Sequence, residues 1–213
     1  MSIVRNVWDG VKLGEIVLIK HSSTGVPYVG LCQLMNWAKG KGYQVIVDDV
    51  LDTLYLYKTQ MKLAGLNTSI LNDVKVIKLG GRLEVGQVVG HLHIKEPVIR
   101  EQEYGQIFAP LSGGGGAVVN PVLGFEKLFL LAESKREVLS TVNGILPLIS
   151  DERRIGVYFI NTDLLRSAAP EALPLLEELA STVIRVDVEG KSHKFSIVKS
   201  VNKELWGVSF VLP

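Results

Sequence analysis

Apolar residues occur along this chain in two alternating patterns, short unbroken runs and longer helical stripes. Residues 16–19 form a run typical of a strand that is buried on both faces of a parallel sheet. An apolar stripe at helical spacing then runs from Tyr28 to Ala38, and Gly40 and Gly42 allow that helix to end. Residues 44–47 predict a second buried strand, which ends at two acids.

The alternation continues through the middle of the chain. Asp52 or Thr53 is expected to cap a helix that ends at Gly65, and residues 74–79 predict a third strand. Residues 80–111 have a weaker pattern, in which 88–94 predict an added strand and 99–108 a short helix. Four glycines at 113–116 predict a flexible loop rather than a linker between domains, because residues 125–131 again predict a strand.

Toward the end of the chain, the alternation of strands and helices gives way to consecutive strands. Ser134 and Glu137 form a capping box, in which Glu137 is expected to bond back to the Ser134 amide, at the start of a helix. Residues 155–160 predict a strand, and a helix follows Pro170. Residues 182–188, 194–199 and 207–212 predict strands that leave no room for helices between them, so they must pair antiparallel.

This order predicts one three-layer α/β domain over residues 1–213, with a mostly parallel central sheet and antiparallel C-terminal strands. Twenty-three basic and 22 acidic side chains give a net charge of +1, which argues against a nucleic-acid partner. The single cysteine excludes an internal disulfide and lies in the first helical stripe, where packing is its expected role. We expect a cytoplasmic protein, because the sequence has neither a signal-peptide pattern nor an apolar run of the ~20 residues that span a bilayer.

Parallel sheets bind ligands beyond the carboxyl ends of their strands. Three polar segments meet that description, at residues 21–27, 48–52 and 161–163. The hydroxyl and amide groups of the first segment can hold an anion or the carboxylate of a partner, or they can simply cap the helix. The acids of the second can be catalytic or metal-binding, or plain solvated acids. The candidate binding residues are His21, Ser22, Ser23, Thr24, Gly25, Asp48, Asp49, Asp52, Asn161 and Thr162.

Other residue patterns give weaker evidence for a functional site. His91 and His93 alternate onto one side of a strand, which is ligand-like spacing, but no cysteine cluster completes the set, so we expect no metal site. No Ser-His-Asp arrangement is present, and we expect no catalytic residue and no cofactor. The glycine loop at residues 113–116 can be a gate over the strand ends or an ordinary mobile loop.

Two parts of the chain resemble a known superfamily. The segment from Gly14 to Ile19, the loop and helix after it, and the strand from Gly42 to Asp49 resemble the opening of a RecA-like ATPase of the KaiC type. Residues 179–188, 196–199 and 207–212 are similar to the terminal strands of that family. The chain looks closest to a small archaeal family of uncharacterised proteins with this architecture and no intact P-loop. The resemblance implies a RecA-like domain and side-by-side assembly into a homo-oligomer.

The phosphate loop departs from the superfamily pattern. A Walker A loop needs glycines, a lysine for the β and γ phosphates and a hydroxyl for magnesium. In one alignment Val26, Pro27 and Tyr28 occupy the Gly-Lys-Thr positions, and in the neighbouring alignment Gly25 is kept but the lysine is still missing. Pro27 also has no amide proton to donate.

Two further features of the superfamily are missing or reduced. Ala132 stands where a Walker B aspartate is expected, with Glu133 one position late. The paired lysine and arginine of the sensor are reduced to Lys199, with Val201 in the second position. Only Asp48 and Asp49 match, as the acidic pair that orients the attacking water in such ATPases.

The sequence therefore predicts a non-catalytic RecA-like protein that binds a peptide or protein partner at the remodelled nucleotide-site crevice. The alternative is a weak nucleotide-binding, ATPase-like protein with an atypical phosphate loop built from Lys20, His21, Ser22 and Ser23. The apolar strand from Trp206 to Leu212 favours self-association, because an exposed edge of this kind can pair with another chain.

Overall fold

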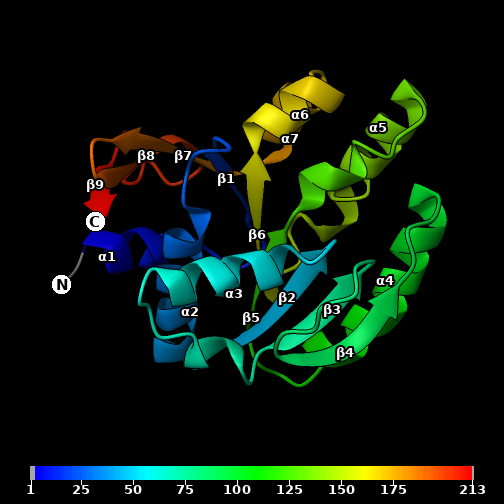
Figure 1. The fold of residues 1–213 in the computed structure, drawn as a ribbon, viewed down its shortest axis with the longest axis horizontal. Helices are drawn as coiled ribbons and strands as arrows, with labels where there is room; N and C mark the ends of the chain where they lie inside the picture. The colour runs from blue at the N-terminus through cyan, green and yellow to red at the C-terminus, as the bar shows by residue number, and fades with distance from the viewer. Residues whose placement is uncertain (1–2, 213) are drawn as a thin grey trace.

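A computed structural model describes residues 3–212, and its central feature is one nine-stranded sheet (Figure 1). The strand order is β4-β3-β2-β5-β6-β1-β7-β8-β9. The strands from β4 to β7 in this order pair in parallel, whereas β7 with β8 and β8 with β9 pair antiparallel. The bounds are β1 (Ile16–His21), β2 (Gln44–Val50), β3 (Lys75–Leu79), β4 (Gln87–Leu92), β5 (Val118–Leu123), β6 (Arg154–Asn161), β7 (Thr182–Glu189), β8 (Ser192–Ser200) and β9 (Ser209–Leu212).

Helices cover both faces of the sheet and give three layers (Figure 1). One face packs against α1 (Ile3–Asp9), α2 (Pro27–Gly40) and α3 (Thr53–Leu63). The other face packs against α4 (Pro97–Ser112), α5 (Lys135–Asn143), α6 (Thr162–Ala168) and α7 (Ala172–Leu179). Short 3₁₀ turns lie at η1 (Ser69–Leu71), η2 (Phe125–Leu128) and η3 (Leu146–Leu148). None of the helices within residues 3–212 combines the length and the apolar character that a bilayer crossing requires.

The central strands are buried on both faces, as their unbroken apolar runs predict. In β1, Val17 and Ile19 join the core under α1, α2 and α3, while Ile16 and Leu18 join the core on the opposite face. Side chains alternate along a strand, so a run without polar interruption fits only a sheet covered on both sides. The predicted α/β class, the mostly parallel sheet and the antiparallel C-terminal strands are confirmed.

One predicted strand is wrong. Residues 125–131 do not form a strand, because Gly124 turns the chain with a φ of +77° into η2. The strand before this turn is β5, whose six residues are all buried. Asn120 and Pro121 lie in its middle, and the sequence pattern missed it because proline cannot donate to a sheet ladder and is rare in central strands.

Two local predictions also need correction. Asp48 and Asp49 lie inside β2 rather than beyond it, because the strand continues to Val50. Asp52 precedes α3 in a left-handed conformation, and neither its side chain nor that of Thr53 caps the helix. Asp49 takes that role from within the strand, since its Oδ1 accepts the Leu54 amide at 2.8 Å.

The start of α5 differs in one detail. Ser134 Oγ accepts the Glu137 amide at 3.2 Å, as predicted, but Glu137 Oε2 accepts the amide of Glu133, at 2.9 Å, rather than that of Ser134. Helix α6 was not predicted from the sequence. It begins directly after β6, because Asn161 Oδ1 accepts the amides of Asp163 and Leu164 at 3.0 and 3.3 Å.

Candidate functional site

The loops that follow β1 and β6 lie side by side at the carboxyl ends of the sheet. Register places His21 at the end of β1 next to Asn161 at the end of β6. Thr162 Oγ1 donates to the carbonyl of His21 at 3.1 Å and ties the two strand ends together. Because β5 is the next strand beyond β6, the segment that follows it also reaches this edge.

The polar groups of the two loops bond mainly to each other. The Ser23 amide donates to Asp163 Oδ2 at 2.8 Å, and Ser23 Oγ donates to Asn161 Oδ1 at 3.2 Å. The hydroxyls of Ser22 and Thr24 lie 3.1 Å apart. We call these five residues, Ser22, Ser23, Thr24, Asn161 and Asp163, the β1–β6 rim. Within the same loop, the Gly25 amide donates to the Ser22 carbonyl at 3.1 Å and closes a turn.

The rim carries one ionised carboxylate, that of Asp163, which forms an exposed ion pair with Arg166 at 3.8 Å. The hydrogen bond from the Ser23 amide lowers the pKa of Asp163, so its exposed carboxylate is ionised at neutral pH. Lys20, the cation nearest the loop in sequence, forms an ion pair with Glu177. Helix α2 starts at Pro27, which has no amide proton, and its preceding residue Val26 offers no side-chain cap. These features make the loop a poor place for a phosphate group.

Two buried polar groups lie at the same edge with unsatisfied atoms. His21 Nε2 and Glu126 Oε2 find no hydrogen-bond partner within residues 3–212. Burial lowers the pKa of His21, which is therefore neutral at pH 7. Burial also raises the pKa of Glu126, in η2, to about 7. Glu126 was missed from the sequence, because its segment was predicted as a strand.

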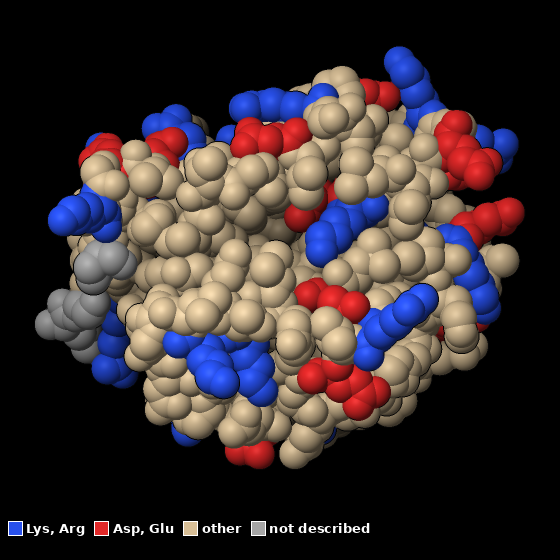
Figure 2. Space-filling model, viewed as in Figure 1, with Lys and Arg blue, Asp and Glu red and all other residues tan. Residues whose placement is uncertain are grey.

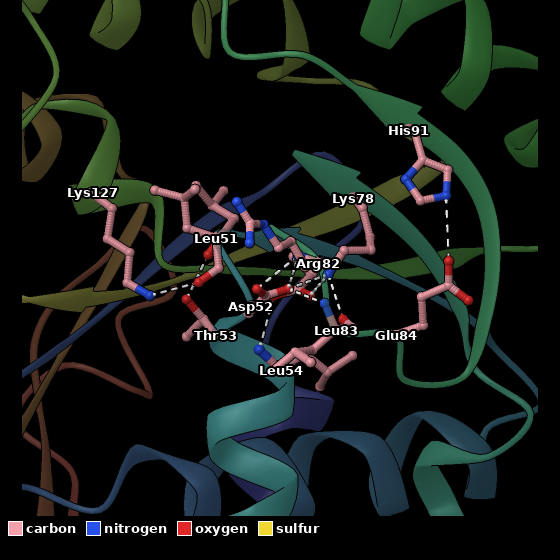
Figure 3. A network of polar contacts seen from close by, with 12 residues as sticks. Leu51, Asp52, Thr53, Leu54, Lys78, Arg82, Leu83, Glu84, His91 and Lys127 are labelled. Carbon is pink, nitrogen blue, oxygen red and sulfur yellow. Dashed lines mark hydrogen bonds and ion pairs between the residues drawn. The ribbon is translucent and has the colours of Figure 1, made fainter. Parts of the chain in front are cut away.

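The acids at the end of β2 belong to a separate, closed network (Figure 3). Lys78 in β3 is 1% exposed, and its ammonium group donates to Asp49 Oδ2 at 3.0 Å, Asp52 Oδ1 at 2.7 Å and the Leu83 carbonyl at 2.6 Å. These three bonds use all three ammonium protons. Partial burial of Asp52 opposes ionisation, but bonds from Lys78 and from the amides of Arg82 and Leu83 lower its pKa to about 2.

The three predicted polar segments therefore do not meet at one point. The structure brings together His21, Ser22, Ser23, Thr24, Gly25, Asn161 and Thr162. Asp49 and Asp52 lie on the far side of β6 and β5, three strand spacings or about 14 Å from β1. Asp48 is on the opposite face of the sheet from Asp49, where the Tyr104 hydroxyl donates to its Oδ2 at 2.8 Å.

The positions compared with ATPase motifs are also rearranged. Ala132 and Glu133 do not end a strand but lie between η2 and α5, while β5 ends in Val122 and Leu123. Lys199 Nζ donates to the carbonyls of Glu177 and Glu178 at 2.7 and 2.9 Å, at the end of α7. Val201 lies beyond β8 and is exposed.

The surface over the strand ends is hollowed. Figure 2 shows a depression at the centre of the face that Figure 1 presents. It lies between helix α3 on one side and, on the other, α6 and the loop after β1. Charged side chains of both signs line one of its borders. Among residues 3–212 no group of three or more His, Cys, Asp or Glu side chains is arranged to hold a metal ion. The β1–β6 rim can offer hydrogen-bonding side chains and a carboxylate.

Comparisons with known proteins place the chain in a family. Residues 6–210 match the family described as "Pyrococcus protein of unknown function, DUF257". The chain belongs to this Pyrococcus family. A solved structure, PH0250 from Pyrococcus horikoshii OT3, is 34% identical over 96% of this chain and 95% of that one, with a TM-score of 0.85. No curated protein matches the sequence.

More distant solved structures show the fold of this DUF257 member. The KaiC-like protein PH0186 from P. horikoshii OT3 is 14% identical over 94% of this chain and 86% of its own, with a TM-score of 0.61. PH0321 from P. horikoshii, crystallised in complex with an unknown peptide, is 12% identical over 89% and 86% of the two chains, with a TM-score of 0.57. The predicted RecA/KaiC-like fold is therefore confirmed.

Proposed function

We propose that this protein is a cytoplasmic RecA/KaiC-like binding protein that holds a peptide or protein segment at the β1–β6 rim and does not hydrolyse nucleotide. The observation that carries the proposal is the bond between the Ser23 amide and Asp163 Oδ2. It occupies an amide that a phosphate would need, and it fixes an ionised carboxylate where the phosphate charge would lie.

Several independent residues support the proposal that the protein does not bind or hydrolyse nucleotide. Val26, Pro27 and Tyr28 stand where a Walker A motif needs glycine, lysine and a hydroxyl. The acidic pair that orients water in such ATPases is represented by Asp48 and Asp49. Asp49 has both oxygens engaged, by Lys78 and by the Leu54 amide, and Asp48 faces the opposite side of the sheet. Neither acid is placed to activate water over the rim.

The chemistry of the rim favours a partner rich in hydrogen-bond donors. Asp163 supplies a carboxylate, and Ser22 and Thr24 supply hydroxyls that can accept or donate. An extended peptide carries one amide and one carbonyl per residue, and a basic side chain on it would pair with Asp163. PH0321, which shares the fold, was crystallised with a peptide, which supports the view that this architecture can accommodate one.

The proposal is tested with a displayed library of random peptides selected against the intact protein. The affinities of the selected peptides are then measured by fluorescence anisotropy. Replacing Ser22 and Ser23 together by leucine should weaken binding at least about tenfold, because two hydrogen-bonding side chains are lost and the loop is crowded. The matched control is the pair Ser69→Leu and Asn72→Leu, two exposed residues in and beside η1, which should leave the affinity unchanged.

The peptides themselves provide a second readout. Selected sequences should contain Lys or Arg, and Asp163→Asn should reduce their affinity. Peptides that bind equally well to the Ser22/Ser23 variant would contradict the rim as the binding site. Peptides without any basic residue would contradict the role given to Asp163.

A further inference from the structure

A cavity of about 350 Å³ lies on the opposite face of the sheet from α2 and α3. The sheet residues of β2, β3, β5 and β6 form its floor, and α4 and α5 form its walls. Most of the surface is apolar, with contributions from Ile77, Leu79, Leu92, Phe108, Val122 and Leu128. An apolar cavity of this size is typical of a small-molecule site.

The floor of the cavity carries one unsatisfied acceptor. Asp48 lines the cavity, and its Oδ2 accepts the Tyr104 hydroxyl at 2.8 Å. Its other oxygen, Oδ1, is buried and has no hydrogen-bond partner within residues 3–212. Burial, opposed by Arg154 and by the Tyr104 bond, raises the pKa of Asp48 to about 6. A buried acceptor without a partner costs free energy of folding. A ligand that donates a hydrogen bond to Oδ1 therefore binds more tightly than its apolar contacts alone would allow.

Arg154, which is buried next to the cavity floor, balances the negative charge of Asp48. The side chain is 0% exposed, and its three guanidinium nitrogens have no hydrogen-bond partner in the described part of the chain. Its guanidinium carbon lies 5.2 Å from the ring centre of Phe108, which lines the cavity. Arg154 does not itself line the cavity, so its positive charge offsets that of Asp48 without being offered to a ligand.

The remaining charged residues of the lining are also balanced. Arg153 donates from Nε and Nη2 to the two oxygens of Asp151, at 2.7 and 2.8 Å. Arg100 donates to Thr141 Oγ1 at 3.3 Å, and the neighbouring Glu101 carries the opposite charge. Glu101 Oε1, in the α4 wall, is a second buried acceptor without a partner in the described part of the chain. A cavity with paired charges has no net attraction for an ion that would have to leave water.

We infer that this cavity binds an uncharged, mainly apolar small molecule whose hydrogen-bond donor bonds to Oδ1 of Asp48. The apolar walls favour an apolar body, the free oxygen requires a donor, and the balanced charges favour a neutral ligand. This site is distinct from the β1–β6 rim, because it lies under α4 and α5.

The test compares two probes of nearly the same shape, indole and benzofuran, by ligand-observed NMR titration of the intact protein. Indole has an N–H donor, whereas benzofuran has an oxygen acceptor in the same place. We expect indole to bind at least about tenfold more tightly than benzofuran. The substitution Asp48→Asn keeps the shape but can replace the free acceptor by a donor, so the preference should fall below about threefold or reverse.

A second variant keeps the test decisive if Asp48→Asn does not fold. Val122→Phe adds a ring to the cavity floor and should weaken the binding of both probes at least about tenfold. The rim variant Ser22→Leu with Ser23→Leu should leave indole binding unchanged, which separates this site from the proposed peptide site. Equal affinities for the two probes, no binding of indole at millimolar concentration, or unchanged indole binding in Val122→Phe would each overturn the inference.

Discussion

Lys78 shows at the scale of one residue how the end of β2 is held in place. Its ammonium group lies between Asp49 and Asp52 and is almost completely buried. Asp49 in turn accepts the Leu54 amide, one of the free amides in the first turn of α3, so the same carboxylate links a strand, a lysine and a helix start. An acid engaged in this way stabilises the fold and has no oxygen left to activate water.

Replacing Lys78 by methionine should therefore be strongly destabilising. The substitution keeps the length of the side chain but leaves Asp49 and Asp52 without their cation. Removing one partner of a buried ion pair costs about 3–5 kcal/mol of unfolding free energy. Urea denaturation should show this loss of unfolding free energy. The control Lys39→Met, at an exposed lysine, should change the unfolding free energy by less than about 0.5 kcal/mol. A loss below about 1 kcal/mol for Lys78→Met would show that the network does not hold these elements together.

Glu126 should make the stability of the protein depend on pH. Burial raises its pKa from 4.5 to about 7, so the folded state binds this proton more tightly than the unfolded state does. The ionised form is disfavoured in the folded protein, and its destabilising contribution grows from about pH 4.5 to about pH 7 and is constant above that. Glu126→Gln should therefore stabilise the protein by about 3 kcal/mol at pH 8 and have little effect at pH 4.5.

The control for this prediction is Glu204→Gln, which changes an exposed carboxylate. Thermal unfolding followed by circular dichroism at several pH values measures both variants. If Glu126→Gln gave the same shift in melting temperature at pH 4.5 and pH 8, the perturbed titration of Glu126 would be excluded.

At the scale of elements, β9 leaves an edge of the sheet open. It pairs with β8 on one side, buries Phe210 and Leu212, and exposes 56% of Val211. Trp206, in the turn before β9, is 64% exposed. An open edge with apolar side chains is a surface that a second chain can pair with.

We therefore expect the protein to self-associate through β9. Sedimentation velocity at tens of micromolar should show a species larger than the monomer. Val211→Lys should shift the distribution toward the monomer, because a charge on an edge strand opposes pairing. Val201→Lys, an exposed valine outside β9, is the matched control and should leave the distribution unchanged. A monomer alone for the unaltered protein would contradict the prediction.

The predictability of each element depended on how far its sequence followed a regular pattern. Strand β1 and helix α2 followed from unbroken apolar runs and a helical stripe, which are local signals. Strand β5 did not, because Asn120 and Pro121 break its apolar run. Asn120 is accommodated by a bond from its side-chain amide to the Ile46 carbonyl on β2, a partner 74 residues away that no local pattern reveals.

At the scale of the whole molecule, the sequence predicted the layers and part of the candidate site. The proximity of the loops after β1 and β6 followed from parallel strands, whose carboxyl ends share an edge. The roles of Asp163, Glu126 and Lys78 did not follow, because each depends on packing between segments distant in the chain. The order of the strands decides that Asp49 and Asp52 lie away from the rim, and this order was not predicted.

This protein has a RecA/KaiC-like fold, and we propose that it lacks the phosphate chemistry of ATPases with that fold. The decisive measurement is thermal unfolding with and without millimolar Mg²⁺-ATP. A nucleotide bound with micromolar affinity would stabilise the fold by about 4 kcal/mol, which corresponds to a rise of several degrees in melting temperature. We predict a change of less than about 1 °C, because the Ser23 amide is already bonded to Asp163 and Pro27 has no amide proton to offer a phosphate. A rise of several degrees, or release of inorganic phosphate from ATP by the purified protein, would show that nucleotide chemistry is retained.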